Sequence, residues 1–260
     1  MKKRLLILLC FVSWTSYLQA QTYLDLNDTT AVLKELFKIE GVKMRYNQLD
    51  KKSYNCGYWT ADREIAYNIR TDGEGKYYVR WANTIPFKTS KGSFLLLCFL
   101  TGQHLGEDGF SSDPFQQSVA IVQHTKDNPK KKLVVFNQNF ATVDVFAEPL
   151  AIRDNGNDNF VIEAIGTSTK GGDINDITSW YDIDSLRWIF SMETGYNNAP
   201  NVGDDASLSH SYKVKLKTIF KGKKTYIEAQ KEGKKGNVAY KEITYYAFDE
   251  AQKKFVQDKK

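Results

Sequence analysis

Hydrophobic and polar residues alternate with a period of two along much of this chain, which is typical of strands with one buried face. Tyr212, Val214 and Leu216, for example, alternate with three lysines. Residues 94–100 are apolar at every position, which predicts a central strand covered on both faces. We therefore expect a mainly β fold of antiparallel hairpins or a meander, built as a sandwich, a barrel or a small propeller-like unit.

One segment near the N-terminus has helical spacing instead. Its apolar residues fall on one face of a helix: Val32, Leu33, Leu36, Phe37 and Ile39. Asp28 or Thr29 is suited to cap its start, and Gly41 is suited to end it. The pattern predicts one short N-terminal helix.

A faint internal repeat appears at an offset of 65 residues. The tripeptide Ile-Glu-Ala at 162–164 recurs at 227–229, and the Lys-Gly pair at 170–171 recurs at 235–236. We therefore predict a duplicated antiparallel unit, with Ile162 and Ile227 in equivalent inward positions, and likewise Tyr181 and Tyr246. The chain after residue 20 is expected to form a single β-rich domain, residues 21–260, and a division into 21–140 and 141–260 stays open.

The first twenty residues have the pattern of a cleaved Sec-type signal peptide of the bacterial kind. Lys2, Lys3 and Arg4 precede an apolar run at 5–12, and Ala20 is the small residue expected at the cut. Lipidation of Cys10 is disfavoured because leucine, not a small residue, precedes it. The protein is expected to be secreted or periplasmic, without a membrane span after cleavage, because no later apolar run is long enough.

The net charge argues against nucleic acid as a partner. Of 36 Lys and Arg residues, three lie in the signal peptide, and the 33 that remain face 31 acids, a net charge of +2. Nucleic-acid binding needs a concentrated basic surface, and nothing in this balance predicts one.

Two cysteines remain after processing, Cys56 and Cys98. An even pair in an exported protein predicts a disulfide, here closing a loop of about 40 residues. The alternative is two separate buried thiols that act as small hydrophobic groups.

An acidic turn is the best candidate for an ion site: Asp154, Asn155, Asn157 and Asp158 surround a glycine. Calcium prefers several oxygen ligands around a tight bend. A hairpin turn explains the same residues through backbone geometry alone, and no glutamate occupies the twelfth position of the loop. Calcium is thus the one cofactor for which the sequence offers a candidate site, and a metal site beyond it stays unassigned.

Aromatic residues supply the candidates for ligand contact: Phe110, Tyr196, Trp59, Trp81, Trp180 and Trp188. Aromatic rings stack on sugars, although the tryptophans also fit core packing because each lies in strand-like alternation. Two long polar loops, residues 102–114 and 194–209, hold Phe110 and Tyr196.

No catalytic residue is assigned, because the chain has no nucleophile motif and no histidine pair with metal-ligand spacing. The sequence therefore favours an exported, non-catalytic β-domain that binds a glycan or an envelope protein. Two alternatives stay open. A secreted hydrolase acting on a polysaccharide or peptide would use a group such as His104 with Glu107, and a structural component of the cell envelope would use neither.

Overall fold

The structure is a computed structural model. It describes residues 21–47, 52–60, 75–102, 115–125, 128, 130–143, 150–156, 158–170, 172–202, 206–222 and 224–258. The predicted signal peptide with Cys10 and the candidates His104, Glu107, Phe110 and Asn157 lie outside the described residues.

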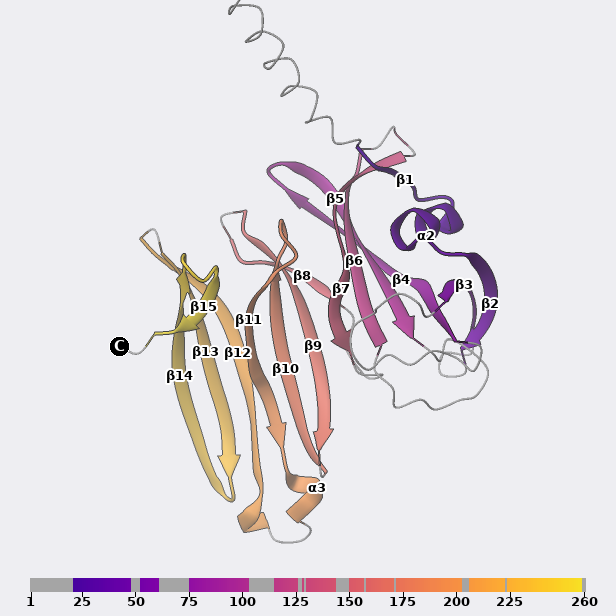
Figure 1. The fold of residues 1–260 in the computed structure, drawn as a ribbon. Coiled ribbons are helices and arrows are strands. Elements are labelled where there is room, and N and C mark those ends of the chain that lie inside the picture. Colours follow the sequence, from indigo (N-terminus) through magenta and orange to yellow (C-terminus); the bar gives the residue numbers. More distant parts are fainter. Residues whose placement is uncertain are drawn as a thin grey trace, which may run out of the picture.

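The N-terminal half forms a seven-stranded antiparallel sheet, sheet A, in the order β1-β7-β6-β5-β4-β3-β2. Its strands are β1 (Tyr23–Asp25), β2 (Gly41–Asn47), β3 (Lys52–Thr60), β4 (Lys76–Thr89), β5 (Gly92–Gly102), β6 (Phe115–Gln123) and β7 (Lys130–Val143). Figure 1 shows this sheet curving around the short helix α2 (Thr29–Phe37), so that it forms a half-barrel.

Helix α2 confirms the predicted N-terminal helix and its cap. The Asp28 carboxylate accepts a hydrogen bond from the Ala31 backbone N–H at 2.9 Å. The helix ends earlier than predicted, because Lys38 adopts the left-handed conformation (φ 52°) and its N–H bonds the carbonyl of Lys34. Gly41 instead begins β2, where a Cβ atom would lie 2.7 Å from the Tyr58 hydroxyl.

Strand β5 is the middle strand of sheet A, as the apolar run at 94–100 predicts. Leu97 and Phe99 pack in the cluster that includes the apolar face of α2. Leu96 and Cys98 point the other way, into a cluster shared with the second sheet. Both faces of β5 are therefore covered, which explains why its sequence does not alternate.

The C-terminal half forms an eight-stranded antiparallel meander, sheet B, with its strands in chain order. They are β8 (Ala151–Asp154), β9 (Phe160–Lys170), β10 (Asp173–Asp182), β11 (Trp188–Asn197), β12 (His210–Lys221), β13 (Lys224–Lys235), β14 (Val238–Asp249) and β15 (Lys254–Gln257). Helix α3 (Ala199–Val202) and the 3₁₀ turn η2 (Ala206–Leu208) connect β11 to β12. In Figure 1 the end of sheet B that carries α3 extends away from sheet A.

Two hairpins of sheet B pair in the same register. Ile162 lies opposite Tyr181 in β9–β10, and Ile227 lies opposite Tyr246 in β13–β14. Both isoleucines are fully buried, at 0% exposure. Their positions are not equivalent as predicted, because Ile162 packs in the cluster shared with sheet A and Ile227 packs in a cluster within sheet B. The hairpins thus match in register alone at the predicted offset of 65 residues, and a duplication as their origin stays a prediction.

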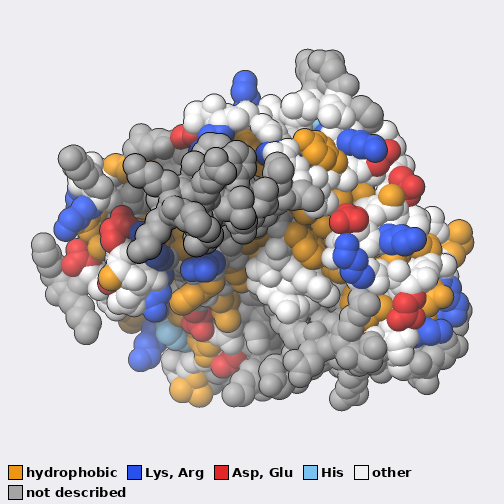
Figure 2. All heavy atoms as spheres, turned by 45° about the horizontal axis from the view of Figure 1, so that its top comes forward, with side chains coloured by type: hydrophobic (Ala, Val, Ile, Leu, Met, Phe, Trp, Pro, Cys, Tyr) orange, Lys and Arg blue, Asp and Glu red, His pale blue; other side chains and the backbone are white. Residues whose placement is uncertain are grey.

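The mainly β, antiparallel architecture confirms the predicted fold class, and the half-barrel and the meander fit its sandwich or barrel description. Among the described residues, no helix has the length and apolar character needed to cross a bilayer. Figure 2 shows acidic, basic and apolar side chains interspersed over one face of the molecule.

Candidate functional site

The predicted disulfide between Cys56 and Cys98 is wrong, because both thiols are free and buried. Strand β4 lies between β3 and β5, so the two cysteines are two strand spacings, roughly 10 Å, apart. A disulfide needs Cα atoms within about 7 Å. Burial raises the pKa of Cys98 to about 12. Burial also raises the pKa of Cys56 to about 11, although the positive charges of Arg80 and Arg45 act to lower it.

The four candidate tryptophans differ in exposure. Trp59 and Trp180 are 1% and 0% exposed, so both lie in the core, as the core-packing alternative predicts. Trp81 is half-buried, and its Nε1 donates to the Asn83 carbonyl and the Thr84 hydroxyl, both at 3.0 Å. Trp188 is 48% exposed on β11 and is the tryptophan of this set most open to solvent.

The acidic turn between β8 and β9 directs its carboxylates to different partners. Asp154 accepts from the Gly156 backbone N–H at 2.7 Å, which closes the turn. Asp158 accepts hydrogen bonds from the backbone N–H and the hydroxyl of Ser90 in the β4–β5 turn, and these bonds lower its pKa. Within the described ranges, no group of three or more His, Cys, Asp or Glu side chains is placed to hold a metal.

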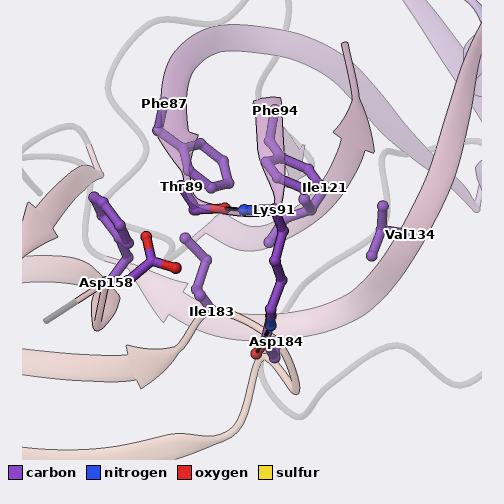
Figure 3. Close-up of a pocket in the computed structure, with 10 residues that line it drawn as sticks. Phe87, Thr89, Lys91, Phe94, Ile121, Val134, Asp158, Ile183 and Asp184 are labelled. Atoms are coloured by element: carbon purple, nitrogen blue, oxygen red, sulfur yellow. Dashed lines mark hydrogen bonds and ion pairs between the residues drawn. The ribbon is translucent and has the colours of Figure 1, made fainter. Parts of the chain in front are cut away.

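Asp158 also lines a small apolar pocket between the two sheets (Figure 3). Phe87 and Phe94 stack there at 5.5 Å, and Lys91 reaches over the opening to Asp184, with 3.1 Å between Nζ and Oδ2. The pocket volume is about 50 Å³, which is room for one or two water molecules. This junction therefore fastens the sheets together and is too small for a ligand.

A larger set of rings lies at the far end of sheet B, on three of its strands. We call it the aromatic platform and define it as Tyr196 of β11, His210 and Tyr212 of β12, and Tyr240 of β14. Tyr196 and Tyr212 are direct cross-strand partners with ring centroids 5.7 Å apart. The His210 ring lies between the others, 5.3 Å from Tyr196, 5.6 Å from Tyr212 and 5.9 Å from Tyr240.

Hydrogen bonds fix the orientation of every ring of the platform. The Tyr196 hydroxyl donates to Asp173 at 2.9 Å, a bond that raises the pKa of Tyr196. The Tyr212 hydroxyl donates to Glu193, and the His210 Nε2 and Tyr240 hydroxyl lie 2.9 Å apart. Each ring is half-buried, so part of its surface is open to solvent. Lys231 adds an ammonium 3.6 Å from the centroid of the Tyr212 ring.

A glycine near the C-terminal end of β13 makes this arrangement possible. Gly233 lies between Tyr212 and Tyr240 in the register of the sheet. A Cβ atom there would lie 2.4 Å from the Ser211 carbonyl oxygen and 2.6 Å from the Tyr212 Cβ. Without a side chain at this position, His210 can reach Tyr240 across β13.

Sequence reasoning identified one member of the platform, Tyr196, and missed the other three. His210 looked isolated because two of the rings around it, Tyr196 and Tyr240, lie on other strands, and Tyr240 is 30 residues away along the chain. One signal was available: an isolated glycine inside a strand pattern marks a close approach of neighbouring chain, and Gly233 is such a residue.

Comparisons of the chain with protein-family models, with curated proteins and with solved structures gave no match.

Proposed function

We propose that this protein is an exported, non-catalytic β-domain that binds a glycan outside the cytoplasm through the aromatic platform. The observation that supports this best is the set of four rings, within 6 Å of their neighbours, on a sheet face where each ring stays partly exposed. Rings in such a row match the apolar faces of successive sugars.

The surroundings of the rings favour a glycan over a protein partner. Sugar hydroxyls need hydrogen-bond acceptors and donors beside the stacking surface, and Asp173, Glu193 and Lys231 lie beside it. The rings belong to strands of a paired sheet and are held by hydrogen bonds, so little side-chain entropy is lost when a ligand binds. Protein interfaces, in contrast, have an apolar core depleted in charged residues.

The test is a binding screen of the purified mature protein against soluble bacterial and plant polysaccharides, read by affinity electrophoresis. We expect Tyr196→Ala and Tyr212→Ala each to weaken binding about tenfold, as follows from roughly 1.5 kcal/mol per stacked ring. Tyr23→Ala is the matched control, because Tyr23 is 47% exposed but lies on sheet A. Equal binding by all three variants would contradict the assignment of the platform.

The same screen separates the alternatives. Release of shorter fragments from a bound polysaccharide would show a hydrolase, and retention of an envelope protein without any glycan would show a protein-binding or structural role.

Export itself is tested by intact mass. We expect the mature chain to begin within a residue or two of Gln21, and a chain that retains Met1 would contradict export.

A further inference from the structure

A second concave site lies at the opposite end of sheet B from the aromatic platform. The β14–β15 hairpin folds back, so that β15 contacts β11 as well as its partner β14. The hollow beneath this hairpin has a volume of about 510 Å³. Small-molecule sites typically measure roughly 300–1,000 Å³, so the hollow, which we call the β15 pocket, is of the right size.

The floor of the β15 pocket is apolar. Val161, Ile189, Phe248 and Phe255 line it from four strands of sheet B. Phe248 and Phe255 are cross-strand partners, and their rings meet edge to face at 5.1 Å. The apolar part of a bound ligand therefore lies against hydrocarbon and ring surface, and its burial stabilises the complex.

The charged side chains at the rim of the β15 pocket differ in whether they have hydrogen-bond or ion-pair partners. Asp182 accepts from the backbone N–H of Ser185 at 2.7 Å and from its hydroxyl at 2.6 Å. Glu250 pairs with Lys253 at 2.9 Å. The Arg187 guanidinium, which also lines the pocket, has no hydrogen bond or ion pair with any residue that the structure describes.

We propose that the β15 pocket binds a small amphipathic anion, a hydrocarbon chain or ring that ends in a carboxylate. The apolar part lies on Phe248 and Phe255, and the carboxylate accepts a bidentate pair of hydrogen bonds from Arg187. The charge selects the ligand: the rim acids are already bonded to Ser185 and Lys253, whereas the rim arginine is available. This inference is independent of the glycan proposal, because the two sites lie at opposite ends of sheet B.

The test uses decanoate, with decan-1-ol and decylamine as matched probes of the same chain length. Isothermal titration calorimetry on the mature protein, below the micelle concentration, should show one site for decanoate and no binding of decylamine. We expect Arg187→Gln to weaken decanoate binding at least about tenfold, because a hydrogen bond to a charged group contributes roughly 1.5–3 kcal/mol. Arg187 is exposed, so this variant should fold normally, with an unchanged melting temperature.

Two further variants make the outcome decisive. Thr225→Trp places a large side chain in the pocket and should abolish decanoate binding. Tyr212→Ala alters only the aromatic platform and should bind decanoate like the wild type. The proposal is overturned if decanoate does not bind, if decylamine binds equally well, or if Arg187→Gln and Thr225→Trp leave the affinity unchanged.

Discussion

The hairpins β9–β10 and β13–β14 pair in one register but lie in different surroundings. Glu163 is opposite Trp180 in the first hairpin, and Glu228 is opposite Tyr245 in the second. In both, the aromatic side chain donates a hydrogen bond to the glutamate. Trp180 is fully buried, whereas Glu228 and Tyr245 are partly exposed.

Trp180 is buried because it belongs to the apolar cluster that includes Phe190 and Ile227, and its partner Glu163 also contacts an arginine. Arg153 of β8 forms an ion pair with Glu163 at 2.7 Å, and its guanidinium carbon lies 5.2 Å from the centroid of the Trp180 ring. It also donates to the Leu216 carbonyl of β12 at 3.2 Å, which connects the two halves of the meander. Cross-strand pairing is thus set within a hairpin, and burial is set by what the rest of the fold places against it.

The largest effect should come from the residue that the two hairpins share. Ile162→Ala and Ile227→Ala each remove a fully buried side chain, so we expect each to lower the free energy of unfolding by about 2–5 kcal/mol. Urea denaturation measures both. A cost below about 1 kcal/mol at one site would show that the cluster at that site closes around the smaller side chain.

Substitution of the two glutamates should lower the stability of the protein by different amounts in the two hairpins. Glu163→Ala leaves the Trp180 N–H without an acceptor and Arg153 without its acid, so we expect a loss of about 2 kcal/mol, reduced by the partial exposure of Arg153. Glu228→Ala breaks the matching bond at a partly exposed site and should lower the urea midpoint only slightly. Equal losses in the two variants would contradict the role assigned to burial.

Two glycines extend the comparison to the aromatic platform. Gly233→Ala in β13 places a methyl group against Ser211 and Tyr212 and should cost about 1–3 kcal/mol. Gly166 in β9 has open space around its Cβ position, so Gly166→Ala should be neutral or stabilise by about 0.5 kcal/mol. Melting temperatures distinguish the two, and a stable Gly233→Ala variant would show that the platform does not need this glycine.

Sequence patterns predicted the elements whose causes are local. The spacing of α2, its cap at Asp28 and the two-sided apolar strand β5 follow from neighbouring residues and were confirmed. The helix end was wrong because Lys38, a residue without the usual preference, takes the left-handed conformation. The disulfide was wrong because cysteine count says nothing of the strand that separates the two residues.

The candidate sites depend on contacts that no local pattern contains. His210 meets Tyr196 and Tyr240 only because β11 to β14 pair in one register across Gly233. The β15 pocket exists because β15 turns back toward β11, and the sequence gives the strand but not its direction. Trp59 and Trp180 show the converse, since their alternation fits both a surface strip and the core.

The smallest effect concerns acid, and it again contrasts the exposed hairpin with the buried one. Hydrogen bonds from Gln230 and then Tyr245 hold the pKa of Glu228 below its ordinary value of 4.5. A carboxylate whose pKa is lower in the folded state stabilises the fold above its unfolded pKa, and that contribution is lost as the pH falls through the folded pKa. The wild type should therefore lose stability more steeply below about pH 4.5 than Glu228→Gln, which has no charge to lose at this position. Urea midpoints between about pH 3 and pH 6 compare the two proteins, and the Glu228 side-chain carbon followed by NMR gives the titration directly. An NMR titration midpoint of Glu228 at or above pH 4.5 would show that the bond to Tyr245 does not favour the charged glutamate at the surface. The two hairpins would then resemble each other in backbone register alone.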